Sequence, residues 1–342
     1  MTLRRLLLLF LLFAAFVLYA AYVVLRPYQG FSEADVFLDI RRGSDALEMA
    51  SSLEAAGVLA SRWSFLLLRA LPARPTLKAG EYRFDRPMSP LDVHRKIADG
   101  DVFFHSFTVP EGYNLFEIAE GVGRTGLITA QEFLLAARQG GRLADLAPGV
   151  PTLEGFLFPD TYRLTRQTTA EELVGQMLRR FRDVWVELGG AGNTLQIVTL
   201  ASLVEEETPR ASERHLVASV FANRLRIGMP LQCDPTVIYA LRLAGRYRGE
   251  LARAELAVSS PYNTYAHPGL PPGPIASPGR ASLAAALAPA SSDFLYFVAD
   301  HKGGHVFSAS LGRHSEAVAR YRRANSRPPK KQPSKKQNAR RR

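Results

Sequence analysis

Three consecutive carboxylates, Glu205 to Glu207, end an apolar helical run and are the first residues of this sequence that point to chemistry. Residues 197–204 before them are mostly apolar and Pro209 follows closely, so the helix is predicted to end at the acidic cluster. Successive helical residues are rotated by about 100°, so the three side chains must lie in different environments. Glu205 comes directly after the apolar run, and we expect it beside the apolar face of the helix.

A carboxyl group held against apolar surface can act as a general acid, because burial disfavours its charged form and raises its pKa. Glu205 is therefore the predicted general acid. The spacing is also open to a simpler interpretation, in which the cluster is the solvated acidic end of a surface helix.

Other kinds of chemistry find little support. The seven histidines are scattered without the spacing of metal ligands, and the Asp300-His301…His305 group falls at a predicted turn, where we expect solvated side chains. Cys233 is the only cysteine, which excludes an intrachain disulfide and a site with several thiolates; we expect it to be a small buried residue. No dinucleotide fingerprint, phosphate loop or Gly-x-Ser-x-Gly motif is found. The sequence predicts no metal and no cofactor.

The net charge of +11 comes almost entirely from the C-terminus, because residues 322–342 hold ten Lys or Arg and no acid. The rest of the chain is nearly neutral, so a nucleic-acid binder is disfavoured. The tail is rich in Pro, Ser and Gln and is predicted to be disordered, with a weak contact to anionic lipid or polymer as the alternative.

The N-terminus carries a predicted membrane anchor. Residues 6–25 contain no charged side chain, and their length matches the apolar core of a bilayer. Arg4 and Arg5 precede this run, so the N-terminus is predicted to be cytoplasmic and the bulk of the chain to lie on the outer, periplasmic side. A cleaved signal peptide is the alternative, but the run is long and Arg26-Pro27 makes a poor cleavage site.

Residues 36–59 and 105–128 align at an offset of 69 as two copies of one strand–turn–helix unit. Each copy has a glycine turn, a capping residue with Glu three positions later, and a closing glycine. These pairs are Gly43 and Gly112, Asp45 and Asn114, Glu48 and Glu117, and Gly57 and Gly126. Residues 107–119 resemble LysM-type peptidoglycan-binding modules. The alternative is a packing unit that never touches glycan.

The remaining pattern predicts a mixed helical body. Expected elements are a strand at 78–84, helices at 90–100, 170–187, 212–227 (capped by Ser212) and 311–321, and a hairpin of 294–298 with 305–307. Between them, residues 260–279 form a stiff Pro- and Gly-rich loop of a kind that is often functional. Residues 152–162 place aromatics and Pro around Glu154 and Asp160, as in the lining of a sugar groove or in a buried hinge.

Taken together, these motifs resemble the endolytic murein transglycosylase family, also called MltG or YceG-like, over nearly the whole chain. The segments that carry the resemblance are Val109-Pro-Glu-Gly112, Leu153–Tyr162, Ala201–Glu205, Ser219–Leu225, Leu231–Tyr239, Tyr262-Asn-Thr-Tyr265, Gly269–Gly273 and Tyr296–Asp300. The resemblance implies a membrane-anchored lyase that acts on nascent peptidoglycan strands and needs no cofactor. It also implies peptidoglycan synthases as protein partners and membrane lipid as the partner of the anchor.

The family's catalytic glutamate falls on Glu205. Such a carboxyl would first protonate the oxygen of the bond between N-acetylmuramic acid and N-acetylglucosamine, and would then take the proton of the muramic C6 hydroxyl as that hydroxyl attacks C1. The product is a 1,6-anhydro end. Five further residues lie in family motifs, where they bind sugar or fix loops: Gln232, Asp234, Tyr239, Asn263 and Tyr265. Glu154 is either a second carboxylate of the groove or a brace for the catalytic helix.

The predicted fold class is α+β, with an N-terminal transmembrane helix, a small LysM-like subdomain and a mixed catalytic domain that carries a C-terminal hairpin. The predicted segments are 1–26 (anchor), 27–150 (LysM-like), 151–322 (catalytic) and 323–342 (basic tail). Two alternative functions stay open: a non-catalytic, membrane-tethered peptidoglycan scaffold, and a glycan hydrolase that uses Glu205 with Glu154 or Asp234.

Overall fold

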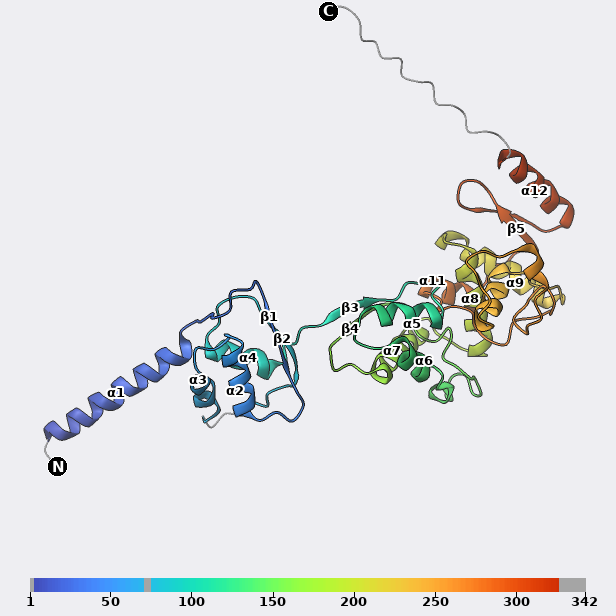
Figure 1. The fold of residues 1–342 in the computed structure, drawn as a ribbon. Coiled ribbons are helices and arrows are strands. Elements are labelled where there is room, and N and C mark those ends of the chain that lie inside the picture. Colours follow the sequence, from blue (N-terminus) through green and yellow to red (C-terminus); the bar gives the residue numbers. More distant parts are fainter. Residues whose placement is uncertain (1–2, 71–74, 326–342) are drawn as a thin grey trace, which may run out of the picture. The chain divides into compact units, whose positions relative to one another are not determined.

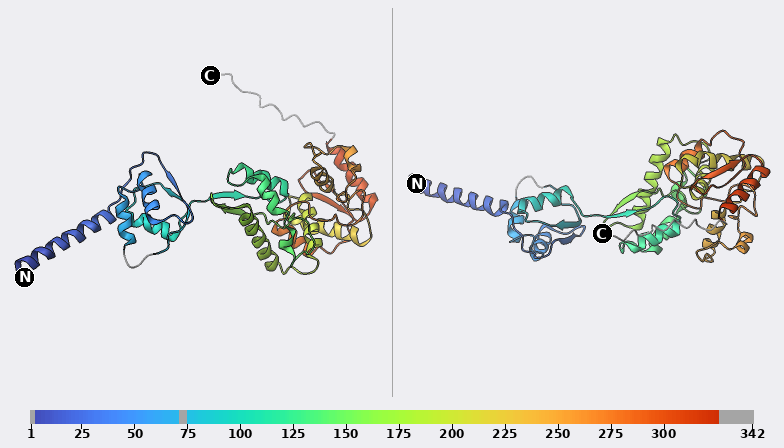
Figure 2. Two further views of the ribbon diagram at one scale, coloured as in Figure 1. Left: turned by 60° about the horizontal axis from the view of Figure 1, so that its bottom comes forward. Right: turned by 90° about the horizontal axis from the view of Figure 1, so that it is seen from above.

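The computed structural model describes residues 3–70 and 75–325, in which the chain forms two compact units. The N-terminal unit comprises the residues up to 107 together with 125–128 and 161–169, and the C-terminal unit comprises 108–124, 129–160 and the residues from 170 onward. Figures 1 and 2 show the elements of both units, coloured along the chain. The model confirms a mixed α+β fold. From residue 326 on, the predicted basic tail lies outside the described residues.

Helix α1, Leu3–Leu25, is the one helix among the described residues that is long and apolar enough to cross a membrane. Its 23 residues correspond to about 34 Å at 1.5 Å per residue, which is slightly more than the thickness of a bilayer core. No residue of the helix is buried. The predicted anchor is thus present as a candidate single-pass membrane segment.

The globular part of the N-terminal unit is built on the antiparallel pair of β1, Val36–Ile40, and β2, Gly80–Phe84, in which Val36 lies opposite Phe84. Helices α2, Ala46–Ala55, and α3, Arg62–Arg69, connect the two strands, and α4, Pro90–Asp99, follows them. A single apolar core holds these elements together, and its largest members include Phe65, Tyr82 and Phe84.

The predicted repeat is confirmed in its local structure. In the first copy Asp45 caps α2 by accepting a bond from the backbone N–H of Glu48 at 2.7 Å. In the second copy, β3, His105–Thr108, precedes α5, Leu115–Arg124, and Asn114 and Glu117 each accept a bond from the other's backbone N–H. The four aligned glycines all have positive φ, at +89° and +82° before the helices and +71° after both, which explains the need for glycine.

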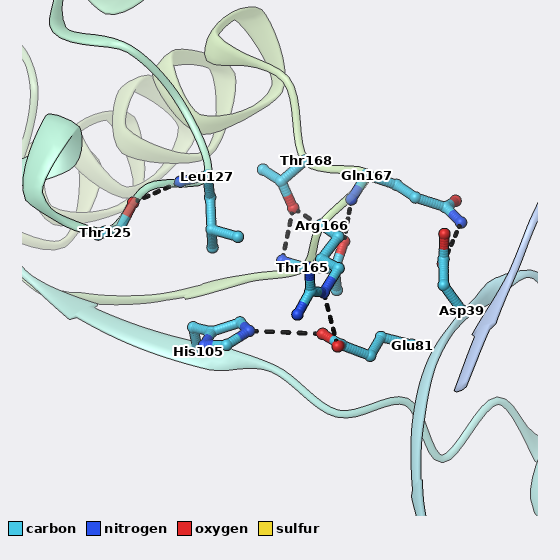
Figure 3. A network of polar contacts seen from close by, with 9 residues as sticks. All are labelled: Asp39, Glu81, His105, Thr125, Leu127, Thr165, Arg166, Gln167 and Thr168. Carbon is cyan, nitrogen blue, oxygen red and sulfur yellow. Dashed lines mark hydrogen bonds and ion pairs between the residues drawn. The ribbon is translucent and has the colours of Figure 1, made fainter. Parts of the chain in front are cut away.

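A buried carboxylate ties three segments of the N-terminal unit together (Figure 3). Glu81 on β2 has a side chain that is only 3% exposed, and it pairs with Arg166 at 2.6 Å and with His105 at 3.4 Å. Arg166 follows β4, Thr161–Leu164, which pairs with β3. The neighbouring Gln167 donates to Asp39 on β1 at 3.3 Å. These contacts hold residues 161–169 in the N-terminal unit, far from their place in the sequence.

The C-terminal unit is mostly helical. Its longer helices are α6, Ala130–Ala137, α7, Ala170–Glu187, α8, Thr194–Glu207, α9, Arg214–Arg226, α10, Asp234–Leu243, α11, Arg280–Leu287, and α12, Leu311–Asn325. Three 3₁₀ turns lie at Gly140–Leu143, Ala211–Glu213 and Arg253–Ala257. The hairpin of β5, Tyr296–Ala299, and β6, His305–Ser308, is antiparallel as predicted.

Several expectations differ from the structure. Ser212 does not cap a helix, because residues 211–213 form a 3₁₀ turn and α9 begins only at Arg214. His305 is not solvated: its Nδ1 lies 2.7 Å from Glu213, and both side chains are 13% exposed. The last helix continues to Asn325, past the predicted start of the tail at 323. The boundary between the two compact units does not fall at residue 150, where the LysM-like segment was predicted to end. Helix α6 packs on α7, and residues 129–160 belong to the C-terminal unit.

We expect Arg166→Gln to destabilise the N-terminal unit by about 2 kcal/mol, because it leaves the buried Glu81 carboxylate without its principal partner. Native-state hydrogen exchange of the amides of β2 measures this loss. The double variant Arg166→Gln/Glu81→Gln should regain most of the protection, since the unpaired charge is then gone.

The matched control is Arg124→Gln, which breaks an exposed helical pair with Glu120 and should cost less than about 0.5 kcal/mol. Equal effects of the Arg166 and Arg124 substitutions would contradict a structural role for the buried carboxylate.

Candidate active site

The acidic cluster lies at the end of α8, as predicted. Asn193 caps the start of this helix by accepting a bond from the N–H of Gln196 at 3.1 Å, and Thr208 ends it in an extended conformation. The residues from Val198 to Val204 are all buried, so the helix is fixed by packing around most of its circumference. The three carboxylates do lie in different environments, and only the side chain of Glu205, 6% exposed, is nearly enclosed among charged partners.

Both oxygens of the Glu205 carboxyl are held. Oε1 accepts a bond from Arg214 Nη2 at 2.7 Å, and Oε2 accepts one from the backbone N–H of Gly279 at 2.8 Å. Burial raises the pKa of Glu205, while Gly279, Ser282 and Arg214 act in the opposite direction and the Glu111 carboxylate adds to the rise. The net pKa is above the ordinary glutamate value, so the carboxyl is poised to carry a proton in spite of its arginine partner.

Arg214 is shared between two carboxylates. Its Nη2 also lies 3.3 Å from Glu111 Oε2, and the arginine side chain is 9% exposed while Glu111 is about half exposed. The Nε of Arg214 is buried and has no hydrogen-bond partner among the described residues, and the same holds for the hydroxyl of Ser277. Buried polar atoms of this kind are normally satisfied, so each of these two atoms can still form a hydrogen bond with a partner such as water.

Two close approaches of the backbone bring these groups together. Residues 112–113 and Ser277 exchange a pair of backbone bonds, at 3.0 Å from the Gly112 N–H and at 2.9 Å from the Ser277 N–H. Ile275 N–H donates to Ser202 on α8 at 3.1 Å, which fixes the Pro- and Gly-rich loop on the helix. A Cβ at position 279 would collide with the Glu111 carboxyl, so a larger residue there would force the Glu111 side chain away from its present position.

Glu154 is buried, with 2% exposure, and does not face a groove. Its two oxygens accept bonds from the N–H of Leu115, at 3.2 and 3.1 Å, and from the Tyr239 hydroxyl at 2.9 Å. Burial raises the pKa of Glu154 to about 7, although these bonds pull it downward. The carboxyl joins the start of α5 to α10, and none of these hydrogen bonds reaches the catalytic helix α8 that Glu154 was expected to brace.

The neighbours of Glu205 occupy different surroundings. Glu206 is an exposed residue that lines a small cavity of about 60 Å³ beside the ion pair of Glu117 and Arg242. Its pKa is raised to about 7, first because the surrounding protein partly shields the carboxyl from water and then because other carboxylates are near. Glu207 is half-buried against Cys233, which is itself buried as predicted. Burial raises the pKa of both groups.

The predicted sugar-binding residues divide into exposed and buried ones. Gln232 and Asp234 are exposed, and the carboxylate of Asp234 accepts a bond from the Tyr265 hydroxyl. Asn263 is fully buried, and its side-chain amide donates to the carbonyls of Leu256 and Val258, at 3.0 and 2.8 Å. Tyr239 is buried on Glu154. Asn263 and Tyr239 are thus engaged in contacts inside the protein, whereas Gln232, Asp234 and Tyr265 remain at least partly exposed.

A larger cavity, of about 480 Å³, lies at the other end of α8 and is lined by Asn193, Gln196, Thr199 and the loop 270–272. Thr199 is six residues before Glu205, about 9 Å along the helix axis. The size of this cavity is therefore no guide to the position of the acidic cluster.

Sequence reasoning did not single out Arg214, Glu111 or Gly279 as functional. Glu111 and Gly112 lie in a segment that was noted as part of the second repeat and of the family resemblance, without a role for either side chain. Arg214 follows Glu205 by nine residues, across a 3₁₀ turn that the sequence did not predict. A possible signal was a basic residue at a helix start so soon after three carboxylates.

We expect the stability of the C-terminal unit to fall as pH rises through about 7, because the pKa of Glu154 is higher in the folded state than its ordinary value of 4.5. This contribution, at most about 3 kcal/mol, is complete below pH 4.5. Thermal unfolding followed by Trp185 fluorescence from pH 4 to 8 measures it, and Glu154→Gln should flatten the dependence.

Tyr239→Phe is the matched variant for that experiment. It removes a bond that lowers the pKa of Glu154, so the fall in stability should move to higher pH. Superimposable profiles of the parent and Glu154→Gln would contradict the assignment to this carboxyl.

Comparison with known proteins gives a consistent result. Residues 38–320 match the sequence profile of the YceG-like family. An endolytic murein transglycosylase of Bacillus subtilis is 32% identical over 320 residues, which cover 87% of this chain and 88% of that protein. The protein of that name in Streptococcus pneumoniae strain D39 is 31% identical, and the match covers 84% of this chain and 58% of that longer protein.

A solved structure gives the same indication. A YceG-like protein of Listeria monocytogenes superposes with a TM-score of 0.54 at 30% sequence identity, and the match covers 83% of this chain and 99% of that one.

Proposed function

This chain belongs to the YceG-like family, and we propose that it is an endolytic murein transglycosylase, a lyase that cuts the glycan strands of peptidoglycan within their length. The names of relatives that match most of the chain support this function over a non-catalytic scaffold or a hydrolase. The observation that carries the proposal is the enclosed Glu205 carboxyl, with its raised pKa, at the end of a rigid helix.

Glu205 acts in turn as acid and base. In its protonated form it donates to the glycosidic oxygen between N-acetylmuramic acid and N-acetylglucosamine, and that bond breaks. The resulting carboxylate then accepts the proton of the muramic C6 hydroxyl, whose oxygen bonds to C1 of the same sugar. Proton transfers balance within the cycle, no water is consumed, and the product carries a 1,6-anhydro end.

Arg214 and Glu111 are positioning residues for this cycle. Arg214 holds Glu205 in place and favours the carboxylate that exists after the first proton transfer. Because both oxygens of Glu205 are engaged, a glycan must displace at least one of these contacts to receive the proton. Glu111 offers Arg214 a second partner at 3.3 Å, so the arginine need not lose its ion pairing when Glu205 turns to substrate.

The sugar-binding roles of Gln232, Asp234 and Tyr265 are part of the proposal, and their exposed or half-exposed positions support it. Glu154, Tyr239 and Asn263 act instead as braces. The strand–helix repeat, whose second copy at residues 107–119 carries the LysM resemblance, is proposed as a LysM-like glycan-binding module. Binding of purified sacculi by the Glu205→Gln variant tests that module separately from cleavage.

Helix α1 is proposed to cross the cytoplasmic membrane once, with the N-terminus in the cytoplasm and both compact units on the outer side. Arg4 and Arg5 before the apolar run support this orientation. Strands that are being polymerised at the membrane are then within reach, and the synthases that make them are the proposed protein partners.

Glu205→Gln is expected to reduce cleavage by at least about 10³-fold, because the amide can neither donate nor accept the proton. Mass spectrometry of the soluble products, from uncrosslinked glycan strands and the detergent-solubilised full chain, measures this loss. Parent products should carry anhydro ends, which are lighter than reducing ends by one water.

The matched control is Glu120→Gln, which neutralises an exposed carboxylate elsewhere in the C-terminal unit and should leave the products unchanged. Reducing ends from the parent would indicate a hydrolase, and undiminished cleavage by Glu205→Gln would remove the proposed role of this residue.

At high pH, kcat/KM should fall as Glu205 loses its proton, because the general acid must be protonated. The midpoint of this basic limb therefore reports the pKa of Glu205. Arg214 lowers that pKa and Glu111 raises it. Arg214→Gln should therefore move the limb to higher pH, and Glu111→Gln should move it to lower pH. Shifts in the same direction, or no shift in either variant, would contradict the arrangement.

A further inference from the structure

The last turns of α1 pack against α3 and α4 of the N-terminal unit. Figure 1 shows α3 beside the C-terminal end of α1. If α1 spans the bilayer, its end at Leu25 marks the level of the headgroups on the outer face. The first turn of α3 then lies at this same level.

A cavity of about 320 Å³ opens between α1 and α3. From α1 and the residues after it, the cavity is lined by Tyr19, Tyr22 and Arg26, and from the start of α3 by Ser61 and Ser64. The Arg26 guanidinium lies 5.5 Å from the centre of the Tyr22 ring. Tyrosine rings, hydroxyls and a guanidinium at a membrane boundary suit the glycerol and phosphate region of a lipid.

The outer face of α3 carries apolar side chains that the fold does not bury. Trp63 is 65% exposed and Leu67 is 38% exposed, and they are one helical turn apart. Tryptophan is enriched at membrane interfaces because its ring is apolar and its N–H is polar. Arg62 lies 5.7 Å from the Trp63 ring, but its charge is partly balanced by Glu54, so the apolar face, more than the net charge, favours lipid.

We propose that the Trp63–Leu67 face of α3 and the adjoining cavity form a phospholipid-docking surface, which engages the leaflet from which α1 emerges. The surface is continuous with the membrane segment, and its residue types match the depth at which α1 places it. Docking would hold the N-terminal unit against the bilayer instead of leaving it to move freely on its anchor. The proposal depends on α1 crossing the membrane and is independent of glycan cleavage.

Fluorescence of the full chain in lipid nanodiscs tests the proposal, because the sequence holds only two tryptophans, Trp63 and Trp185. The nanodiscs contain phosphatidylcholine and phosphatidylglycerol with bromine either near the carbonyl end or near the tip of the acyl chains. The emission of Trp63 is obtained as the difference between the parent and Trp63→Phe. It should be shifted to the blue, and bromine near the carbonyl end should quench it several-fold more than bromine near the tip of the acyl chains. Emission typical of tryptophan in water, unaffected by bromine at either depth, would overturn the proposal.

Hydrogen exchange of α3 gives a second measurement. In nanodiscs, the amides of residues 62–69 should exchange several-fold faster in the double variant Trp63→Ser/Leu67→Ser than in the parent protein. In detergent, the double variant and the parent should exchange at the same rate. Val186→Ser, which removes an even more exposed apolar side chain from the C-terminal unit, should leave the exchange of α3 unchanged. Equal exchange of α3 in the parent and the double variant in nanodiscs would also overturn the proposal.

Discussion

The pairing of Arg214 with Glu205 is the interaction on which the candidate active site depends. Burial alone would keep Glu205 protonated, so it could not serve as a base, whereas pairing alone would keep it ionised, so it could not serve as an acid. In the structure the two effects oppose each other. The Gly279 N–H and Arg214 lower the pKa of Glu205, whereas burial and the Glu111 carboxylate raise it. A carboxyl that must both give and take a proton needs such opposing influences, because neither of its forms can be too stable.

The rest of the C-terminal unit holds these groups in fixed positions relative to one another. α8 supplies Glu205 from a helix whose buried faces prevent rotation, and Glu154 joins α5 to α10 from within the core. The Pro- and Gly-rich loop brings Gly279 to the carboxyl, where the absence of a side chain leaves room for the Glu111 carboxyl. Gln232 and Asp234 are polar and exposed to solvent, and they take no part in these buried contacts.

Local rules predicted the elements of this fold well because capping, glycine turns and apolar periodicity act over a few residues. The limits of α7 agree with the predicted ones, and the two repeats share the predicted turns. The enclosure of the Glu205 side chain was predicted because it follows from the place of this residue on one helix. The partnership of Arg214 with Glu111, the burial of Glu154 and the division of the chain were not predicted, since each depends on contacts between segments that no local pattern connects.

The carboxyl and its partners come from segments spread along the chain, at Glu111, Glu205, Arg214 and Gly279. Gly279 is synthesised 74 residues after Glu205. A nascent chain that has already formed α8 therefore still lacks the backbone N–H that holds one oxygen of Glu205. The order of synthesis thus delays assembly of the complete charge arrangement until Gly279 has been made, well after the membrane segment and α8.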